Sequence, residues 1–359
     1  MKKKSLVYIV LLSLIAAIWT GCSDWTDVSS KGYYKKPSDE YYAALREYKE
    51  SKHQLAFGWF GNWSGEGASL GNSLIGIPDS VDIVSLWNNA TNITEAQKED
   101  LKFVQEVKGT KVLYCIICLD VGDGITPPEH NETDEARHAF WGWVEGDNDA
   151  IYAAIRKYAN AICDTVFKYG YDGFDLDWEA GLPQPFPTNY ELKPMDRIGT
   201  FVDELSKRLG PKSNSGKMLI IDGQPYLIPA EYGVCFDYFV HQAYSSYGDG
   251  DLESRNRTVV NHFKDVLTEE QVTNMSIFTE NFESVSKAMA GGSPNYKDQY
   301  GNIMMSLEGM ARWSPKSGFQ KGGVGTYHME AEYPTNPEYK NLRNAIQIMN
   351  PSPKLLVEY

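Results

Sequence analysis

Carboxylates occupy alternate positions in a short, otherwise apolar segment, Asp172 to Glu179, with the sequence DGFDLDWE. Alternate side chains of a β-strand point to opposite faces, so Asp175, Asp177 and Glu179 should share one face, with neighbouring Cα atoms roughly 6.6 Å apart. Burial and like charge both raise carboxyl pKa values, so at least one of these acids should hold a proton near neutral pH and could serve as a general acid. The opposite face should pack against the protein through Phe174, Leu176 and Trp178.

Two other interpretations of this segment are a solvated edge strand and an oxygen-ligand site for Mg²⁺ or Ca²⁺, because carboxylates at this spacing could share a cation. The large apolar residues of the opposite face argue against an exposed edge. The acids match the DxxDxDxE signature of glycoside hydrolase family 18 at every defining position, with Asp172, Asp175, Asp177 and Glu179. The chain therefore resembles that family. The resemblance implies a glycan substrate, and we expect no metal and no cofactor.

The mechanism has two candidate routes. A retaining glycosidase can use an acid and a nucleophilic carboxylate about 5 to 5.5 Å apart, and the spacing permits Asp177 as that nucleophile. The family resemblance implies instead that the 2-acetamido oxygen of the substrate attacks the anomeric carbon. Glu179 would then protonate the leaving oxygen and later activate water, Asp177 would orient the acetamide, and Asp175 would modulate Asp177 through a shared proton. Tyr244, in the sequence QAY, resembles the family tyrosine that holds the acetamide carbonyl.

Apolar strand candidates alternate with helical stretches along the chain, which is typical of βα units around a parallel sheet. The clearest helix precedes the acidic strand; Asp147 to Asp149 can cap it and Gly170 can end it. A second helix is expected from Met195 to Leu209. Eight strands predict an α/β fold, a (β/α)8 TIM barrel that forms a single catalytic domain. The expected strands are Leu55 to Phe60, Val81 to Trp87, Lys111 to Cys118, Tyr171 to Glu179, Met218 to Gly223, Tyr238 to Tyr244, Met275 to Thr279 and Gly323 to Tyr327.

The active site of such a barrel lies at the carboxyl ends of the strands, which places Glu179 at the mouth and Asp175 deepest. Polar or aromatic residues at other strand ends become candidates for substrate binding by the same rule. A tryptophan there could equally cover the core. The candidates are Trp59, Trp63, Asn88, Gln224, Tyr226, Gln242, Glu280, Asn281 and Tyr327. The stretch from Asp120 to Asp149 could form a wall of the cleft or pack against the barrel.

The composition suits one large domain, with 359 residues of which 42% are hydrophobic. The formal net charge is −14, and removal of a leader containing Lys2 to Lys4 leaves 31 basic residues against 48 acidic ones, a net charge of −17. Such a surface would repel nucleic acid and anionic lipid. We therefore expect no nucleic-acid partner, and a monomer. The many aromatic residues suit a carbohydrate-binding cleft but also fill cores.

The N-terminus predicts export. Lys2 to Lys4 form a basic region, Leu6 to Ile18 an apolar region too short to span a bilayer, and Gly21-Cys22 a cleavage dipeptide. These features resemble a bacterial lipoprotein signal, with lipid on Cys22 and a location at the outer membrane or cell surface of a Gram-negative bacterium. An ordinary secretory leader is the alternative. The expected organisation is a signal peptide (1–21), a lipidated tether and N-terminal extension (22–50) and the catalytic domain (51–359).

Cys115 and Cys118 have the CxxC spacing of a zinc or redox site. They lie in a run that is predicted to be a buried strand, and no second pair of ligands accompanies them. We therefore expect small buried side chains here.

Family 18 contains chitinases and endo-β-N-acetylglucosaminidases, which cut the GlcNAc-GlcNAc core of N-glycans. Chitinases commonly carry an SxGG motif at the third strand, which the segment ICLDVG (117–122) does not contain. The stretch from Asn281 to Gly322 is also short for the α+β domain that many chitinases insert. Both departures favour an endoglycosidase acting on N-glycans. The alternatives are a chitinase and, on the same barrel, a non-catalytic glycan-binding protein; the presence of Glu179 favours an enzyme.

Overall fold

The structure is a computed structural model that describes residues 37–88, 90–181 and 190–351. The chain divides into two compact units, Met1–Tyr42 and Ala43–Tyr359. The described part of the first unit contains only the beginning of helix α2 (Asp39–Glu50), so the following description concerns the second unit. The predicted signal peptide and Cys22 lie outside the described residues. Within the described ranges, no helix has the length and apolar character needed to cross a membrane.

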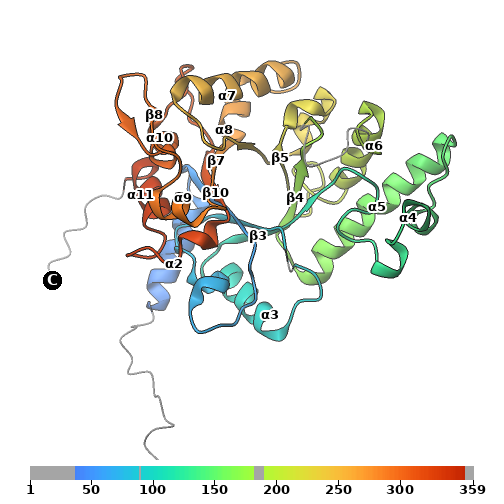
Figure 1. The fold of residues 1–359 in the computed structure, drawn as a ribbon, viewed down its shortest axis with the longest axis horizontal. Helices are drawn as coiled ribbons and strands as arrows, with labels where there is room; N and C mark the ends of the chain where they lie inside the picture. The colour runs from blue at the N-terminus through green and yellow to red at the C-terminus, as the bar shows by residue number, and fades with distance from the viewer. Residues whose placement is uncertain (1–36, 89, 182–189, 352–359) are drawn as a thin grey trace, which may run out of the picture. The chain divides into compact units, whose positions relative to one another are not determined.

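Eight parallel strands close into a barrel in the spatial order β1, β10, β7, β6, β5, β4, β3, β2. Helices surround the barrel (Figure 1). The predicted (β/α)8 TIM barrel is therefore confirmed, and each predicted strand is present. The strands are β1 (Leu55–Phe60), β2 (Ile83–Leu86), β3 (Lys111–Ile117), β4 (Gly173–Trp178), β5 (Met218–Gly223), β6 (Tyr238–Gln242), β7 (Ser276–Asn281) and β10 (Gly323–Tyr327).

The remaining elements connect the barrel strands. The helices are α3 (Glu95–Lys102), α4 (Asp134–Trp141), α5 (Asn148–Tyr169), α6 (Met195–Ser206), α7 (Asp249–Phe263), α8 (Glu269–Met275), α9 (Val285–Ala290), α10 (Ser306–Arg312) and α11 (Lys340–Met349). Shorter helical turns are η1 (Leu70–Asn72), η2 (Leu74–Gly76), η3 (Phe103–Val107), η4 (Pro128–His130), η5 (Pro225–Leu227), η6 (Ala230–Cys235) and η7 (Met329–Glu332). A small antiparallel hairpin joins β8 (Tyr296–Lys297) to β9 (Ile303–Met304).

Helix α5 positions the acidic strand, because it runs directly into β4. Its side-chain cap is Asp147, which accepts a hydrogen bond from the backbone N–H of Ala150 at 3.1 Å. Gly170 ends the helix with φ +76°, a left-handed conformation that glycine adopts without steric cost. One stripe of the helix is buried against the barrel: Ile151, Ile155, Tyr158, Ile162 and Val166.

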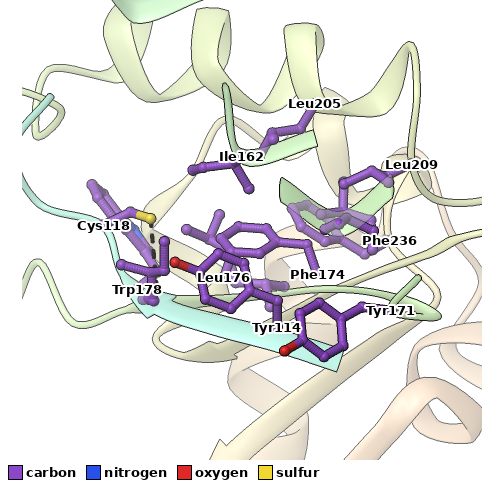
Figure 2. Close-up of a cluster of buried hydrophobic side chains, with 14 of the residues drawn as sticks. Tyr114, Cys118, Ile162, Tyr171, Phe174, Leu176, Trp178, Leu205, Leu209 and Phe236 are labelled. Atoms are coloured by element: carbon purple, nitrogen blue, oxygen red, sulfur yellow. Dashed lines mark hydrogen bonds between the residues drawn. The ribbon is translucent and has the colours of Figure 1, made fainter. Parts of the chain in front are cut away.

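The two faces of β4 lie in different environments. Phe174, Leu176 and Trp178 are fully buried outside the barrel, where they pack with side chains of α5 and α6, including Ile162 and Leu205 (Figure 2). The acids point the other way, into the barrel interior, whose deeper part is filled by apolar side chains. This interior cluster contains Phe57, Trp59, Ile83, Leu113, Cys115, Ile220, Val240 and Ile277. The predicted division of the strand into an apolar and an acidic face is confirmed.

The two residues of the CxxC sequence separate across the sheet. Cys115 belongs to the interior cluster, whereas Cys118 packs in the outer core between barrel and helices. Residues three positions apart along an extended chain point to opposite faces, so the thiols of Cys115 and Cys118 cannot bind one metal ion together. Both cysteines are free and buried, as predicted.

Candidate active site

The acids of β4 are graded in depth along the barrel axis. Asp175 is fully buried, whereas Asp177 and Glu179 are partly exposed. Asp177 and Glu179 line a cavity of about 260 Å³ at the carboxyl ends of the strands. The structure therefore places the predicted general acid at the mouth and the predicted modulating acid below it.

Asp175 is held by two side-chain donors. Its Oδ2 accepts hydrogen bonds from Ser85 Oγ at 2.6 Å and from Trp59 Nε1 at 2.9 Å. Burial raises the pKa of Asp175 to about 6, and the hydrogen bonds from Ser85 and Trp59 oppose this rise because they favour the ionised form. A carboxyl with such a pKa can exchange a proton near neutral pH.

Asp177 is strongly biased toward its neutral form. Burial raises the pKa of Asp177 well above its ordinary value, and the negative charges of Glu179 and Asp175 raise it further. Glu179 also has a raised pKa, caused by burial and opposed by a hydrogen bond with Gln242. A raised pKa keeps a glutamic acid protonated closer to neutral pH, which a general acid requires.

Asp222 is a fourth acid of the site that the sequence analysis missed. It is 1% exposed, lies opposite Asp177 in the register between β4 and β5, and accepts a hydrogen bond from Gln242 Nε2 at 2.8 Å. Burial raises its pKa well above the ordinary value, as do the charges of Asp177 and Asp175. The sequence signal was present: Asp222, the last residue but one of a predicted strand, is in phase with Ile220, which faces the interior.

Aromatic rings form the other wall of the cavity. Tyr244 and Tyr327 stack with ring centroids 5.9 Å apart, and Trp87 lies 5.7 Å from Tyr327. Gly61 leaves room for this arrangement, because a Cβ atom there would lie 2.7 Å from the Trp87 indole. Burial raises the pKa of Tyr244 well above its ordinary value, so its hydroxyl group stays protonated and can donate a hydrogen bond.

Most predicted site residues lie at the mouth. Trp59, Gln242 and Tyr327 line the same cavity as Asp177, Glu179 and Tyr244. Asn88 lines a neighbouring cavity of about 500 Å³, which shares Trp87, Cys115 and Ile117 with the first.

Gln224 and Tyr226 line a smaller cavity of about 200 Å³ next to Gln242. The Gln224 side chain accepts a hydrogen bond from the backbone N–H of Gly181 at 2.6 Å and donates one to the Tyr226 hydroxyl at 3.3 Å. Gln224 therefore supports the chain just after β4. Asn281 ends β7, where its side chain accepts a hydrogen bond from the Glu283 backbone at 2.7 Å.

Two predicted substrate-binding residues are placed away from the mouth, and their predictions were wrong. Trp63 is 1% exposed in the outer core and donates to Asp100 of α3 at 2.8 Å, so it covers the core. Glu280 is fully buried and points out of the barrel, on the same side of β7 as Phe278. Its carboxylate accepts hydrogen bonds from the Ser245 backbone at 2.8 Å and from the Ser306 hydroxyl, which leaves it no access to a glycan.

Part of the stretch from Asp120 to Asp149 lines a cavity at the mouth, and part packs against the barrel. Asp120 and Asp123 line the larger of the two neighbouring cavities, whereas Trp141 and Trp143 are buried in the outer core. Burial raises the pKa of Asp123 to about 6.

Three side chains of the site bring ligand atoms of the kind that bind metal ions close together. Cys115 Sγ and one carboxylate oxygen each of Asp177 and Asp222 lie within 4.8 Å of one another. Burial raises the pKa of the Cys115 thiol well above its ordinary value, and the charge of Asp175 raises it further. Metal binding by cysteine requires the thiolate, which this environment disfavours, so the group fits a metal ion poorly.

Comparison with known proteins gives concordant results. The profile of glycoside hydrolase family 18, BT1044-like, matches residues 21–348. Endo-β-N-acetylglucosaminidase F2 of Elizabethkingia meningoseptica is 26% identical over 332 residues, covering 86% of this chain and 85% of that protein. The solved structure of BT1044 superposes with a TM-score of 0.73 at 34% identity, covering 87% of this chain and 93% of that one.

An endo-β-N-acetylglucosaminidase from Cordyceps militaris shares the fold, with a TM-score of 0.60 at 21% identity, covering 88% of this chain and 98% of the other. The family profile spans nearly the whole chain, and two acids of the DxxDxDxE signature, Asp177 and Glu179, line the barrel cavity. The chain belongs to glycoside hydrolase family 18, in its BT1044-like group.

Proposed function

We propose that this chain is an endo-β-N-acetylglucosaminidase that hydrolyses the β-1,4 bond of the GlcNAc-GlcNAc core of N-glycans, with retention and with help from the acetamido group of the substrate. The similarity to endo-β-N-acetylglucosaminidase F2 over 85% of that protein supports this substrate. The segment between β7 and β10 supports it too. It contains only α9, the β8–β9 hairpin and α10, without the inserted α+β domain that many chitinases carry.

The environment of Asp177 is the observation that carries the mechanism. A carboxylate nucleophile must be ionised to attack, but burial and two neighbouring acids favour the neutral form of Asp177. A neutral carboxyl is a poor nucleophile and a good hydrogen-bonding group. This favours attack by the acetamido oxygen over attack by Asp177.

The steps follow from the positions of the acids. Glu179 donates its proton to the leaving glycosidic oxygen while the acetamido oxygen attacks the anomeric carbon, which gives an oxazolinium ion. Asp177 orients the acetamide and, by yielding its proton to Asp175, can offset the positive charge of that ion. Water then attacks the anomeric carbon as its bond to the acetamido oxygen breaks, and the Glu179 carboxylate takes a proton from that water. Asp175 returns its proton to Asp177, which restores the starting state, and the product keeps the configuration of the substrate. Tyr244 Oη donates a hydrogen bond to the acetamide carbonyl.

The test is to treat an N-glycosylated protein and, separately, chitin oligomers with soluble protein that begins after Cys22, and to follow both by mass spectrometry. We expect peptide bearing a single GlcNAc, and intact chitin. Cleavage of chitin alone would make the protein a chitinase. Binding without cleavage would make it a glycan-binding protein.

Glu179→Gln should abolish turnover and retain glycan binding. Glu129→Gln, the same change at an exposed position of η4, is the matched control and should leave turnover unchanged. A thiazoline mimic of the oxazolinium ion should inhibit, whereas a sugar trapped covalently on Asp177 would refute the assisted mechanism.

We also propose that lipid on Cys22 anchors the protein at the outer membrane or cell surface and that the protein is monomeric. The sequence features of the leader support the anchor. Mass spectrometry of the N-terminal peptide from membranes should find acylated Cys22, and Cys22→Ser should release the protein into the soluble fraction. Size-exclusion chromatography with light scattering tests the monomer.

A further inference from the structure

Asp222 is an acid of the barrel interior for which the proposed mechanism provides no role. It lies in β5 opposite Asp177, and one carboxylate oxygen of each residue lies in a group of three ligand atoms, with Cys115 Sγ, that are all within 4.8 Å of one another. A solvent-inaccessible acid next to the reacting groups strongly affects their ionisation, so its protonation state matters for the whole site.

Hydrogen bonds connect Asp222 to both halves of the catalytic machinery. Gln242 Nε2 donates to Asp222 Oδ1 at 2.8 Å, and the Gln242 side chain lines the same cavity as Glu179, where it lowers the pKa of that acid against the effect of burial. On the other side, a carboxylate oxygen of Asp222 lies within 4.8 Å of one of Asp177, and the negative charges of Asp177 and Asp175 raise the pKa of Asp222. Asp222 therefore links the general acid to the pair of acids below it.

Buried carboxyl groups this close to one another can hydrogen-bond only if they share a proton. An ionised carboxylate only accepts hydrogen bonds, so two carboxyl groups can bond to each other only if one of them is protonated. One oxygen of each acid, Asp175 Oδ1, Asp177 Oδ1 and Asp222 Oδ2, is buried without a donor from any other described side chain. Among the described residues, the groups that face Asp222 supply no positive charge. They are Asp175 and Asp177 of β4, Glu179 just after it, Cys115 of β3, Gln242 of β6 and Tyr244 just beyond β6.

We propose that Asp222 is a positioning residue that stays protonated throughout the reaction. Its hydroxyl group donates a hydrogen bond to the Asp175 and Asp177 pair, and its other oxygen holds the Gln242 side chain beside Glu179. Asp222 touches no reacting atom and acts through these neighbours. Because Asp222 is neutral, it adds no negative charge near Glu179 that would raise the pKa of Glu179 further. The kinetic test of this role rests on the proposed function, whereas the spectroscopic test does not.

Two variants separate the protonated role from its alternatives. Asp222→Asn keeps the shape, the neutral charge, a donor and an acceptor, and should leave both limbs of the pH profile of kcat/KM in place, with kcat within about tenfold of the native value. Asp222→Ala removes the donor, so the pKa of the remaining pair should rise and the acid limb should move up by about one pH unit, with KM nearly unchanged.

Two kinetic outcomes would overturn the proposal. If Asp222 is ionised, Asp222→Asn removes a negative charge near Glu179 and moves the alkaline limb to lower pH. If Asp222 only fills space, Asp222→Ala lowers Tm while both limbs stay in place.

Difference infrared spectroscopy of the protein without substrate tests the proton directly. Near pH 7, the spectrum of native protein should contain one protonated-carboxyl band that the spectrum of Asp222→Asn lacks. If the band that the variant lacks belongs instead to an ionised carboxylate, the proposal is refuted. Asp203→Asn is the matched control. Asp203 is an exposed aspartate of α6 that pairs with Lys207 at 3.2 Å, and its removal should leave the protonated-carboxyl band of Asp222 in place. If the protein cleaves no glycan, the proposed function is refuted, but the infrared difference between native protein and Asp222→Asn should still be seen.

Discussion

The Ser85 hydroxyl group controls the ionisation of the deepest acid of the site. Ser85 is fully buried on β2, and its Oγ donates to Asp175 Oδ2 at 2.6 Å. This hydrogen bond lowers the pKa of Asp175 against the effect of burial. Ser85→Ala deletes the donor and leaves the Trp59 hydrogen bond to the same oxygen.

The size of the effect follows from the energy of one hydrogen bond. A hydrogen bond to a charged group contributes about 1.5 to 3 kcal/mol, and one pKa unit corresponds to about 1.4 kcal/mol. Loss of the bond should therefore raise the pKa of Asp175 by about 1 to 2 units above its present value of about 6. Because the acid limb of kcat/KM reports ionisation of the coupled Asp175 and Asp177 pair, that limb should move to higher pH by a similar amount.

The assay is the pH profile of kcat/KM on the glycan substrate, with Tm measured at each pH. Ser306→Ala is the matched control, because Ser306 is also a fully buried serine that donates to a buried carboxylate, that of Glu280, but outside the barrel. It should lower Tm and leave the acid limb in place. An acid limb that stays put or moves down in folded Ser85→Ala would refute the reasoning.

Three further predictions concern neighbouring residues. Burial and like charge raise the pKa of Asp177, so the stability that its protonated form contributes is present at low pH and is lost as pH rises. Asp177→Asn should therefore raise Tm relative to the native protein by about 2 to 4 °C above neutral pH, and scanning fluorimetry should show this gain shrinking toward pH ~4. Tyr244→Phe should lower kcat about 100-fold, as loss of one preorganised donor does, while Asp177 and Glu179 stay in place; an unchanged kcat would remove Tyr244 from the machinery. Trp63→Phe should lower Tm and leave kcat/KM within about twofold, since Trp63 packs in the outer core and donates to Asp100 away from the cavity. Trp87→Ala at the cavity wall should raise KM by about tenfold.

Most of the fold could be predicted from local patterns in the sequence. The alternation of acids with Phe174, Leu176 and Trp178 predicts β4 and its two faces, because the side-chain period of a strand is a property of the backbone itself. Helix α5 was equally predictable, because Asp147, Gly170 and the apolar stripe between them are local signals.

The composition of the site beyond β4 depended on tertiary structure. Strand β7 is apolar on both faces, as Ile277 and Phe278 show, so the sequence had no alternation from which to decide whether Glu280 or Asn281 faces the interior. Trp63 could be assigned to the core only once Asp100 was placed beside it.

Asp222 joined the site because register sets it opposite Asp177, 45 positions earlier in the chain. The sequence by itself determined which acids share the inner face of β4. Only the closed barrel decided how deeply each is buried and which strand stands next to it. Ionisation depends on those two quantities, and neither is a property of a local segment.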